Sequence, residues 1–256
     1  MILQALMPCT SFAPGVVELY LTGGTDVRWS PTIDYVRLVI LPMLSLMGFA
    51  ATLTLRRRGH YPKGGGGVGL MVEPSRSLTA IKLLERGEDV SLEGISHCVK
   101  LPSHVAQRQA LAATKTLQSA GFEAKIAVET YPADQDTHLA PGSGITLLLK
   151  STSGSIIGAD SIGERGKPAE SVGEEAAAKL IAEVQTGAPV DRHMGDILIP
   201  YMAVAEGRSE ISVSEITLHT LTNIKVAELV TGVSFEVQGE LHKPGKISVD
   251  GIGLKT

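Results

Sequence analysis

Residues 51–72 read ATLTLRRRGHYPKGGGGVGLMV and place two short apolar runs on either side of a basic, glycine-rich segment. Over residues 51–55 alanine and leucine alternate with threonine, which is the two-residue period of a β-strand. A second apolar run at 68–72 follows the four glycines at 64–67, and glycine is the residue that tight turns tolerate best. The stretch therefore predicts a strand, a tight connection and another strand.

The four glycines also raise the question of a phosphate-binding loop. A P-loop needs lysine and serine or threonine after its glycines, and then a helix whose N–H groups meet the phosphates. Here Lys63 precedes the glycines and a strand follows them. The run therefore favours a turn with positive φ angles and close backbone approach, and no Walker motif is predicted.

Residues 38–55 are uncharged and flanked by arginines, and their length is at the lower limit for a membrane-spanning helix. The flanking residues favour another interpretation. The Ser-Pro pair at 30–31 fits the N-cap and first residue of a helix, Asp34 fits its first turn, and Gly48 fits its end. We therefore expect a buried helix followed by a strand, and no membrane association.

Strands, turns and helices continue along the rest of the chain. The clearest helix is 171–187, where Ser171 and Glu174 have capping-box spacing and Gly187 follows the last apolar position. Further expected elements are strands at 16–21, 123–129, 144–150 and 210–218, helices at 103–120 and 221–230, and a hairpin near 243–245. The fold class is α+β or α/β, and the block from Glu85 to Gly166 is interpreted as a small inserted domain.

Composition narrows the classes of function. The 256 residues are 43% hydrophobic and 20% charged, which excludes disorder and coiled coil, and the net charge of −4 provides no overall basic field for nucleic acid. The first charged residue is Glu18, so no basic region of a secretory signal is present. With only Cys9 and Cys98, neither a disulfide framework nor a zinc cluster is predicted, and we expect a reducing, cytoplasmic location.

The seven histidines are the main candidates for chemistry. His193 lies three residues before Asp196, so on a helix the two side chains would share a face. His219 is expected at the end of a strand, just before a helix whose free N–H groups attract anions; the alternative is an ordinary core histidine. The others have no partner at metal-ligand spacing and are assigned to surface or core: His60, His97, His104, His138 and His242.

Three stretches together resemble the RNA 3′-terminal phosphate cyclase family. They are residues 23–26 (GGTD), 58–66 (RGHYPKGGG) and 219–224 (HTLTNI). The middle stretch resembles the family signature of arginine or histidine, glycine, two variable residues, proline, one variable residue and three glycines. The resemblance runs from Gln4 nearly to the C-terminus.

The resemblance implies repeated βαβαββ units, similar to the C-terminal domain of a translation initiation factor, with a small inserted α/β domain. It places the large domain at 1–84 and 167–256 and the insertion at 85–166, and the helix at 171–187 would return the chain to the large domain. Family members begin with a further repeat carrying a Glu-Gly-Gly-Gly-Gln stretch, and none precedes Met1. The chain thus resembles a member without its first repeat.

The resemblance also implies an ATP-dependent ligase that acts on an RNA 3′-phosphate end. A histidine takes AMP from ATP, AMP passes to the RNA 3′-phosphate, and the neighbouring 2′-hydroxyl closes a 2′,3′-cyclic phosphodiester. By position His219 matches the nucleophile, and neutral imidazole is competent for this role near neutral pH. The family uses a divalent cation, magnesium or manganese, held partly by the missing repeat, so no metal ligand is predicted within this chain.

The resemblance also implies individual nucleotide-binding residues in this chain. Gln4 falls where the family has a glutamine near the nucleotide, and Pro31 falls where a proline packs on adenine. The family's main nucleotide-binding stretch corresponds to His193, Met194, Gly195, Asp196 and Ile197. Ile197 replaces the usual glutamine and cannot form a hydrogen bond through its side chain, so one polar contact to the nucleotide is not expected.

Two alternatives stand beside the cyclase. A cyclase-like RNA-binding or ribosome-assembly protein is favoured by the missing repeat and Ile197 and opposed by His219. An enzyme of the enolpyruvyl-transferase type, which has similar repeats, is opposed by the motifs at 58–66 and 219–224. A cluster of basic residues could bind RNA phosphates, or it could simply be a solvated surface. Its members are Arg28, Arg56, Arg57, Arg58 and Lys63. The sequence does not predict an oligomeric state.

Overall fold

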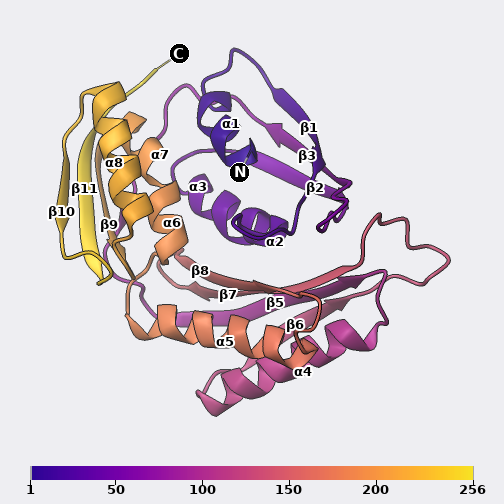
Figure 1. Ribbon diagram of the computed structural model, residues 1–256. Coiled ribbons are helices and arrows are strands. Elements are labelled where there is room, and N and C mark those ends of the chain that lie inside the picture. The colour runs from indigo at the N-terminus through magenta and orange to yellow at the C-terminus, as the bar shows by residue number, and fades with distance from the viewer. Residues whose placement is uncertain (1, 256) are drawn as a thin grey trace.

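The protein, described over residues 2–255 in a computed structural model, is built from three β-sheets and the helices that cover them (Figure 1). The sheets have the strand orders β1-β3-β2, β6-β5-β7-β8 and β10-β11-β9-β4. The mixed α/β class expected from the sequence is confirmed.

The N-terminal part packs helices on one face of the three-stranded sheet. Its elements are α1 (Ile2–Thr10), β1 (Val17–Gly23), α2 (Ile33–Tyr35), η1 (Val36–Ile40), α3 (Leu41–Ser45), β2 (Ala51–Arg57) and β3 (Gly66–Val72). The central strand β3 pairs antiparallel with β1 and β2. Met7, Val39 and Leu70 belong to one buried core, so the helices cover the inner face of this sheet.

The glycine-rich connection before β3 is the turn predicted from the sequence. Gly64 and Gly65 have φ angles of 59° and 71°, which favour glycine. Close backbone approach is also present, since a Cβ atom on Gly59 would lie 2.3 Å from the carbonyl oxygen of Gly23. The β2–β3 loop is thereby held against the end of β1.

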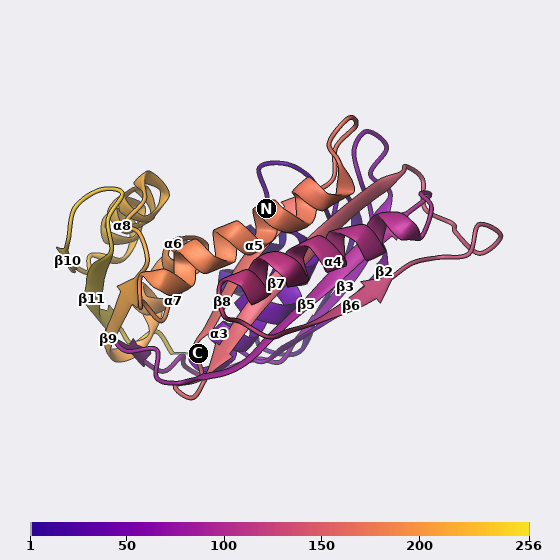
Figure 2. The same ribbon diagram turned by 90° about the horizontal axis from the view of Figure 1, so that it is seen from below.

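The middle part forms a long four-stranded sheet. Its elements, together with the short strand that precedes it, are β4 (Lys82–Leu83), β5 (Asp89–Val99), α4 (His104–Ser119), β6 (Ala124–Glu129), β7 (Gly142–Ser151), β8 (Ile156–Ile162) and α5 (Ala169–Gln185). β5 pairs parallel with β6 and antiparallel with β7. α4 and α5 lie together on one face (Figure 2), while α2 and η1 approach β8, where a Cβ atom on Gly158 would lie 2.7 Å from Tyr35 Cε2.

The C-terminal part contains α6 (Arg192–Ile197), α7 (Ile199–Val204), β9 (Glu206–Val213), α8 (Leu218–Thr231), β10 (Phe235–Gln238) and β11 (Gly245–Ile252). β11 pairs antiparallel with β10 and β9, and β4 adds to β9 in parallel. The connectivity β9-α8-β10-β11 matches that of β1-(α2–α3)-β2-β3, because in both units the last strand lies between the other two. The expected hairpin near 243–245 is confirmed.

Several element limits differ from the predicted ones. The helix expected from the Ser-Pro pair begins at Ile33 instead, because the hydroxyl of Thr32 caps it by accepting a hydrogen bond from the Tyr35 N–H. α5 begins at Ala169, so Ser171 lies inside the helix and the predicted capping box is wrong. Strand β8 is not among the elements predicted from the sequence.

Helix α5 belongs to the four-stranded sheet, which differs from its expected return to the large domain. Val172, Ala176 and Leu180 share a buried core with Leu92 and Leu147. The four-residue apolar repeat of α5 therefore packs on the layer formed by residues 89–162, beside α4. The domain limits 1–84, 85–166 and 167–256 stay a prediction.

The apolar segment 38–55 forms a helix as far as Ser45 and then enters β2, as predicted. Val39, Ile40 and Leu44 are buried in the core. Within residues 2–255, none of the helices combines the length and the apolar character that crossing a bilayer requires.

Candidate active site

His219 lies in the first turn of α8, which corrects its predicted position at the end of a strand. β9 ends at Val213, and Thr217 caps the helix, its hydroxyl accepting a hydrogen bond from the Thr220 N–H at 3.0 Å. The helix therefore opens before His219, and its imidazole is exposed. The unpaired N–H groups and positive dipole end of α8 lie beside it, which is favourable for an anion.

Replacing Thr217 with alanine removes this cap. We expect the free energy of unfolding to fall by about 1 kcal/mol, because the Thr220 N–H loses its acceptor. Urea denaturation at an unchanged slope measures the loss. Thr222→Ala is the matched control, since the Thr222 hydroxyl donates to the Leu218 carbonyl oxygen and does not cap the helix. Equal losses in the two variants would contradict the capping role.

Helix α6, which carries the predicted nucleotide-binding stretch, is fixed in place by Asp191. Its Oδ1 accepts hydrogen bonds from the backbone N–H groups of His193 (3.0 Å) and Met194 (2.9 Å) and from the Tyr35 hydroxyl (2.6 Å). Its Oδ2 accepts from the Gly158 N–H at 2.9 Å. This buried carboxylate therefore ties α6 to α2 and β8. Asp191 is not among the residues predicted for the site, although aspartate before a helix is a recognisable N-cap signal.

The side-by-side packing of α6 and α8 brings His219 to Asp196. Asn223, one turn after His219, donates from Nδ2 to the backbone oxygen of Asp196 at 3.1 Å. Burial raises the pKa of Asp196 to about 6, and the charges of His193 and His219 oppose that rise. The structure thus gathers His193, Asp196 and His219 from two helices.

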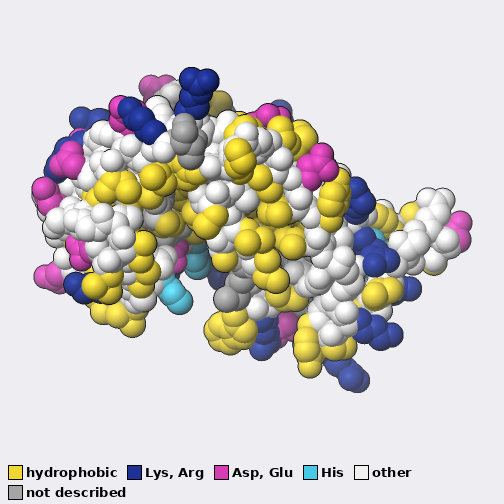
Figure 3. Space-filling model, turned by 90° about the horizontal axis from the view of Figure 1, so that it is seen from above, with side chains coloured by type: hydrophobic (Ala, Val, Ile, Leu, Met, Phe, Trp, Pro, Cys, Tyr) yellow, Lys and Arg dark blue, Asp and Glu magenta, His cyan; other side chains and the backbone are white. Residues whose placement is uncertain are grey.

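A cavity of about 740 Å³ opens beside this group, between α1 and the helices α6–α8. Three of the predicted nucleotide-binding residues line it, namely Gln4, Asp196 and Ile197, and most of the remaining wall is apolar. Figure 3 shows apolar side chains (yellow) gathered on the face seen from above. The volume lies within the roughly 300–1,000 Å³ range of small-molecule sites.

The other predicted nucleotide-binding residues do not line this cavity. Met194 is fully buried in the core, and Gly195 lies against Val213, so neither offers a side chain to a ligand. His193 is exposed. Pro31 is half-buried, and its neighbours Ser30 and Thr32, but not Pro31 itself, line a second cavity of about 340 Å³ beside the β8–α5 region.

Arg58 lies in a buried cluster of charges, which corrects its predicted contact with RNA. Its Nε and Nη2 donate to Glu129 at 2.7 and 2.8 Å, and it pairs with Asp34 at 2.7 Å and with Asp26 at 3.5 Å. Burial works to raise the pKa of Glu129, but the hydrogen bonds and charge of Arg58 lower it to about 2. Burial raises the pKa of Asp26 to about 6.

Two histidines that have no partner at metal-ligand spacing along the sequence contact each other in this cluster. His60 Nε2 and His97 Nε2 lie 3.2 Å apart, and both side chains are buried. Burial, assisted by the charge of Arg58, lowers the pKa of His97 and lowers that of His60 to about 4. Because His60 lies in the β2–β3 loop and His97 on β5, only the packing of the two sheets brings them together.

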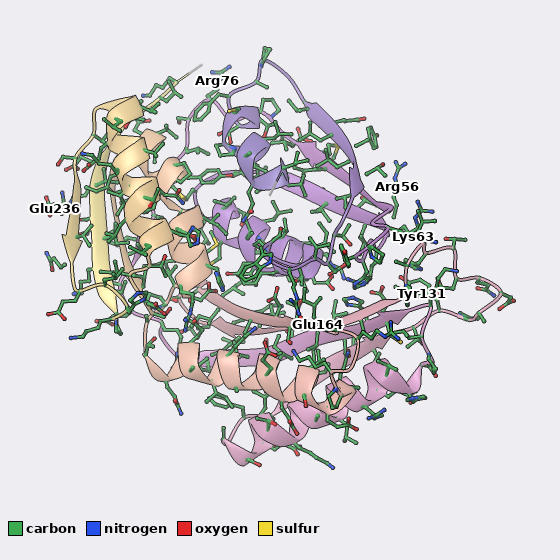
Figure 4. All side chains as sticks on the ribbon, in the orientation of Figure 1. Arg56, Lys63, Arg76, Tyr131, Glu164 and Glu236 are labelled. Carbon is green, nitrogen blue, oxygen red and sulfur yellow. The ribbon has the colours of Figure 1, made fainter. Side chains whose placement is uncertain are left out.

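Of the other basic residues predicted to meet RNA, Arg28 pairs with Glu164 beside the second cavity, whereas Arg56 and Lys63 lie at one edge of the molecule. Figure 4 places Arg56 and Lys63 at this edge, near Tyr131 in the loop after β6. The Arg56 guanidinium lies 5.0 Å from the centre of the Tyr20 ring. The Arg57 side chain binds the glycine turn, because its Nε donates a hydrogen bond to the Gly65 carbonyl oxygen at 2.7 Å.

Comparison with known proteins identifies relatives over nearly the whole chain. The family profile described as RNA 3′-terminal phosphate cyclase matches residues 1–237. A protein of that name from Ignicoccus hospitalis is 48% identical over 254 residues, which cover 98% of this chain and 72% of the relative. Those from Desulfurococcus amylolyticus and Hyperthermus butylicus are 49% and 47% identical, and each alignment covers 100% of this chain and 72% of the relative.

The matched region includes the three stretches that carry the resemblance, residues 23–26, 58–66 and 219–224. It also includes α6, α8 and the residues between them, which form the group around His219. This chain belongs to the RNA 3′-terminal phosphate cyclase family.

Proposed function

We propose that this chain is an ATP-dependent RNA 3′-phosphate cyclase that works through a covalent AMP adduct on His219. The observation that supports this most directly is the contact between α6 and α8. The Asn223–Asp196 hydrogen bond joins the helix that carries His219 to the predicted nucleotide-binding stretch, and both bonded residues line a cavity of suitable size. Relatives named RNA 3′-terminal phosphate cyclase at 47–49% identity support the same reaction.

In the first step the neutral imidazole of His219 attacks the α-phosphorus of ATP. A P–N bond forms, the P–O bond to pyrophosphate breaks, and the imidazole carries the positive charge until its proton leaves. Asp196, whose pKa is about 6, is ionised at neutral pH and stabilises that charge. The N–H groups that open α8 stabilise the negative charge that develops on phosphate oxygen.

In the later steps AMP passes from His219 to an oxygen of the RNA 3′-phosphate. The neighbouring 2′-hydroxyl then attacks this activated phosphorus, AMP leaves, and the cyclic phosphodiester remains. On the RNA, both bonds form at the terminal ribose and phosphate alone. Weak dependence on RNA sequence follows from that chemistry.

The divalent cation of the reaction, magnesium or manganese, is assigned to the phosphates of ATP, whose charge it would neutralise. Among the side chains described here, the group of three with metal-binding atoms in reach is Asp26, His60 and His97. That group includes neither His219 nor Asp196. The residues of α6 and α8 are therefore proposed to bind and orient the nucleotide without ligating the ion.

We also infer that the chain contains repeated βαβαββ units like those of the initiation-factor domain. The shared connectivity of β1–β3 and β9–β11 supports this inference, and β4 beside β9 would be the first strand of the second unit. The four-stranded layer from β5 to β8 then corresponds to the insertion at 85–166, and α5 packs on it.

The reaction is tested with an RNA that bears a labelled 3′-phosphate. With ATP and magnesium, the label should become resistant to phosphatase as the cyclic ester forms, and omission of ATP should prevent this. A folded chain that binds this RNA without cyclising it would instead support the cyclase-like binding protein. Ile197, an apolar residue of the cavity wall, is the observation that favours that second function.

Replacing Ile197 with glutamine restores the polar side chain that the family has at this position. We expect the dissociation constant for ATP to fall roughly 2–10-fold, because one added hydrogen bond stabilises by about 0.5–1.5 kcal/mol. Titration calorimetry measures it, and Ile197→Leu is the control that changes shape without polarity. The same affinity in both variants would argue against a nucleotide contact here.

The basic edge predicts different salt responses for the two substrates. Raising the salt concentration should weaken RNA binding more than ATP binding, because RNA releases counterions from several phosphates. Lys63→Ala should reduce the salt slope by about 1. Lys255, exposed and paired with Glu206 near the C-terminal end, is the control position. A salt response that Lys63→Ala leaves unchanged would remove this edge from the RNA-binding surface.

A further inference from the structure

We propose that Asp26, His60 and His97 form a binding site for a divalent transition-metal ion, with zinc as the best fit. One carboxylate oxygen of Asp26 and one ring nitrogen of each histidine lie within 4.8 Å of one another. The three residues are 2%, 4% and 1% exposed. They come from the segment after β1, the β2–β3 loop and β5, and the site does not depend on the reaction proposed above.

The spacing of the two imidazoles suits coordination. Their Nε2 atoms lie 3.2 Å apart. In a tetrahedral site with Zn–N bonds of about 2.0–2.1 Å, two nitrogen ligands are separated by roughly 3.3 Å. Neutral imidazole is the form that binds a metal. Two nitrogens and one carboxylate oxygen form a donor set that zinc accepts, with water as the fourth ligand.

Buried polar atoms around the three residues lack partners. Asp26 Oδ2 accepts a hydrogen bond from the Thr25 hydroxyl at 2.6 Å, but Asp26 Oδ1 has no hydrogen-bond partner, and neither does His97 Nδ1. A buried acceptor left without a partner costs about 1–3 kcal/mol, which coordination would remove for Asp26. His97 Nδ1 lies 3.9 Å from Asp34 Oδ2, and a carboxylate behind a ligating histidine orients the ring for metal binding.

Charged side chains of both signs surround the three residues. The carboxylates of Asp26, Asp34 and Glu129 face the guanidinium groups of Arg58 and Arg37, which leaves one negative charge in excess. A bound ion would join the end of β1 and the β2–β3 loop to β5. It would therefore hold the three-stranded sheet against the four-stranded sheet.

The test is a metal titration of the full chain after chelator treatment, without nucleotide. We expect one equivalent of Co²⁺ to bind with the intense visible absorption of a tetrahedral site, Zn²⁺ to displace it, and Zn²⁺ to raise the melting temperature. His97→Gln should weaken Zn²⁺ binding by at least the roughly 10–100-fold that loss of an outer partner costs. His242→Gln, an exposed histidine paired with Glu215, and His193→Gln on α6 should each retain full affinity.

The wild-type titration is decisive even where a variant fails to fold. A wild-type chain that binds no stoichiometric Co²⁺ or Zn²⁺ would overturn the proposal, as would binding that His193→Gln abolishes. His60→Gln provides a second ligand variant on a different element. Circular dichroism confirms that each variant is folded before its affinity is compared.

Discussion

His219→Ala should abolish the covalent protein–AMP adduct and lower RNA cyclisation by roughly 10⁴-fold or more, the scale on which an enzyme loses rate with its nucleophile. Alanine has no atom that can form a P–N bond. The fold should be unaffected, because His219 is exposed and surface substitutions change stability by about 0.5 kcal/mol or less. Incubation with α-labelled ATP and magnesium, followed by a denaturing gel, measures the adduct.

His242→Ala is the matched control, because His242 is also exposed and also lies beside a carboxylate, that of Glu215. It should form the adduct at the wild-type level. A labelled adduct that survives in His219→Ala would show that another residue is the nucleophile. An adduct absent from both variants and from the wild type would leave the binding protein as the better function.

Arg58→Met should lower the free energy of unfolding by about 3–5 kcal/mol at neutral pH, the loss typical of breaking a buried ion pair. Methionine fills much of the same space but leaves three carboxylates, those of Asp26, Asp34 and Glu129, without their shared cation. Urea denaturation monitored by circular dichroism measures the change. Arg56→Met, at an exposed position over Tyr20, should change stability by about 1 kcal/mol or less.

The loss of unfolding free energy in Arg58→Met should also depend on pH. In the wild type Arg58 holds the pKa of Glu129 at about 2, so this contribution is present above pH 4.5 and is lost as the pH falls toward 2. In the variant the unpaired carboxylates are buried without a cation, and their protonation relieves the cost. The wild-type and variant stabilities should therefore converge on acidification. A gap that stays constant from neutral pH to about pH 4 would show that lost packing, and not lost charge pairing, is the cause.

The predictions that succeeded for the fold rest on local signals. The alternation over 51–55, the glycines at 64–67 and the helix predicted at 103–120 are set by neighbouring residues, and the structure confirms them, the helix running from His104 to Ser119. The predicted helix starts that were wrong lie where two nearby residues could each cap the helix. At α2, Thr32 and not Ser30 caps the helix, and at α8 the cap is Thr217, so each helix start moved by a few residues.

For the candidate site too, local signals were predictable and long-range contacts were not. The stretch from His193 to Ile197 and the motif at His219 are recognisable along the chain, and the packing of α6 on α8 brings them side by side. Asp191, which ties α6 to Tyr35 and Gly158, contacts residues far away in the sequence. Its role was therefore out of reach of spacing arguments, although its N-cap position was not.

The amino-acid order of this protein is enough to predict most of the secondary structure and the family and to propose a nucleophile, because periodicity, turn residues and motifs are short-range features. Packing alone revealed that Arg58 is buried among three carboxylates, that His60 meets His97, and that α5 joins the four-stranded sheet. Those outcomes depend on where apolar surfaces of distant segments bury one another and on which charges are then left to pair. Such contacts are long-range, and no spacing along the chain records them.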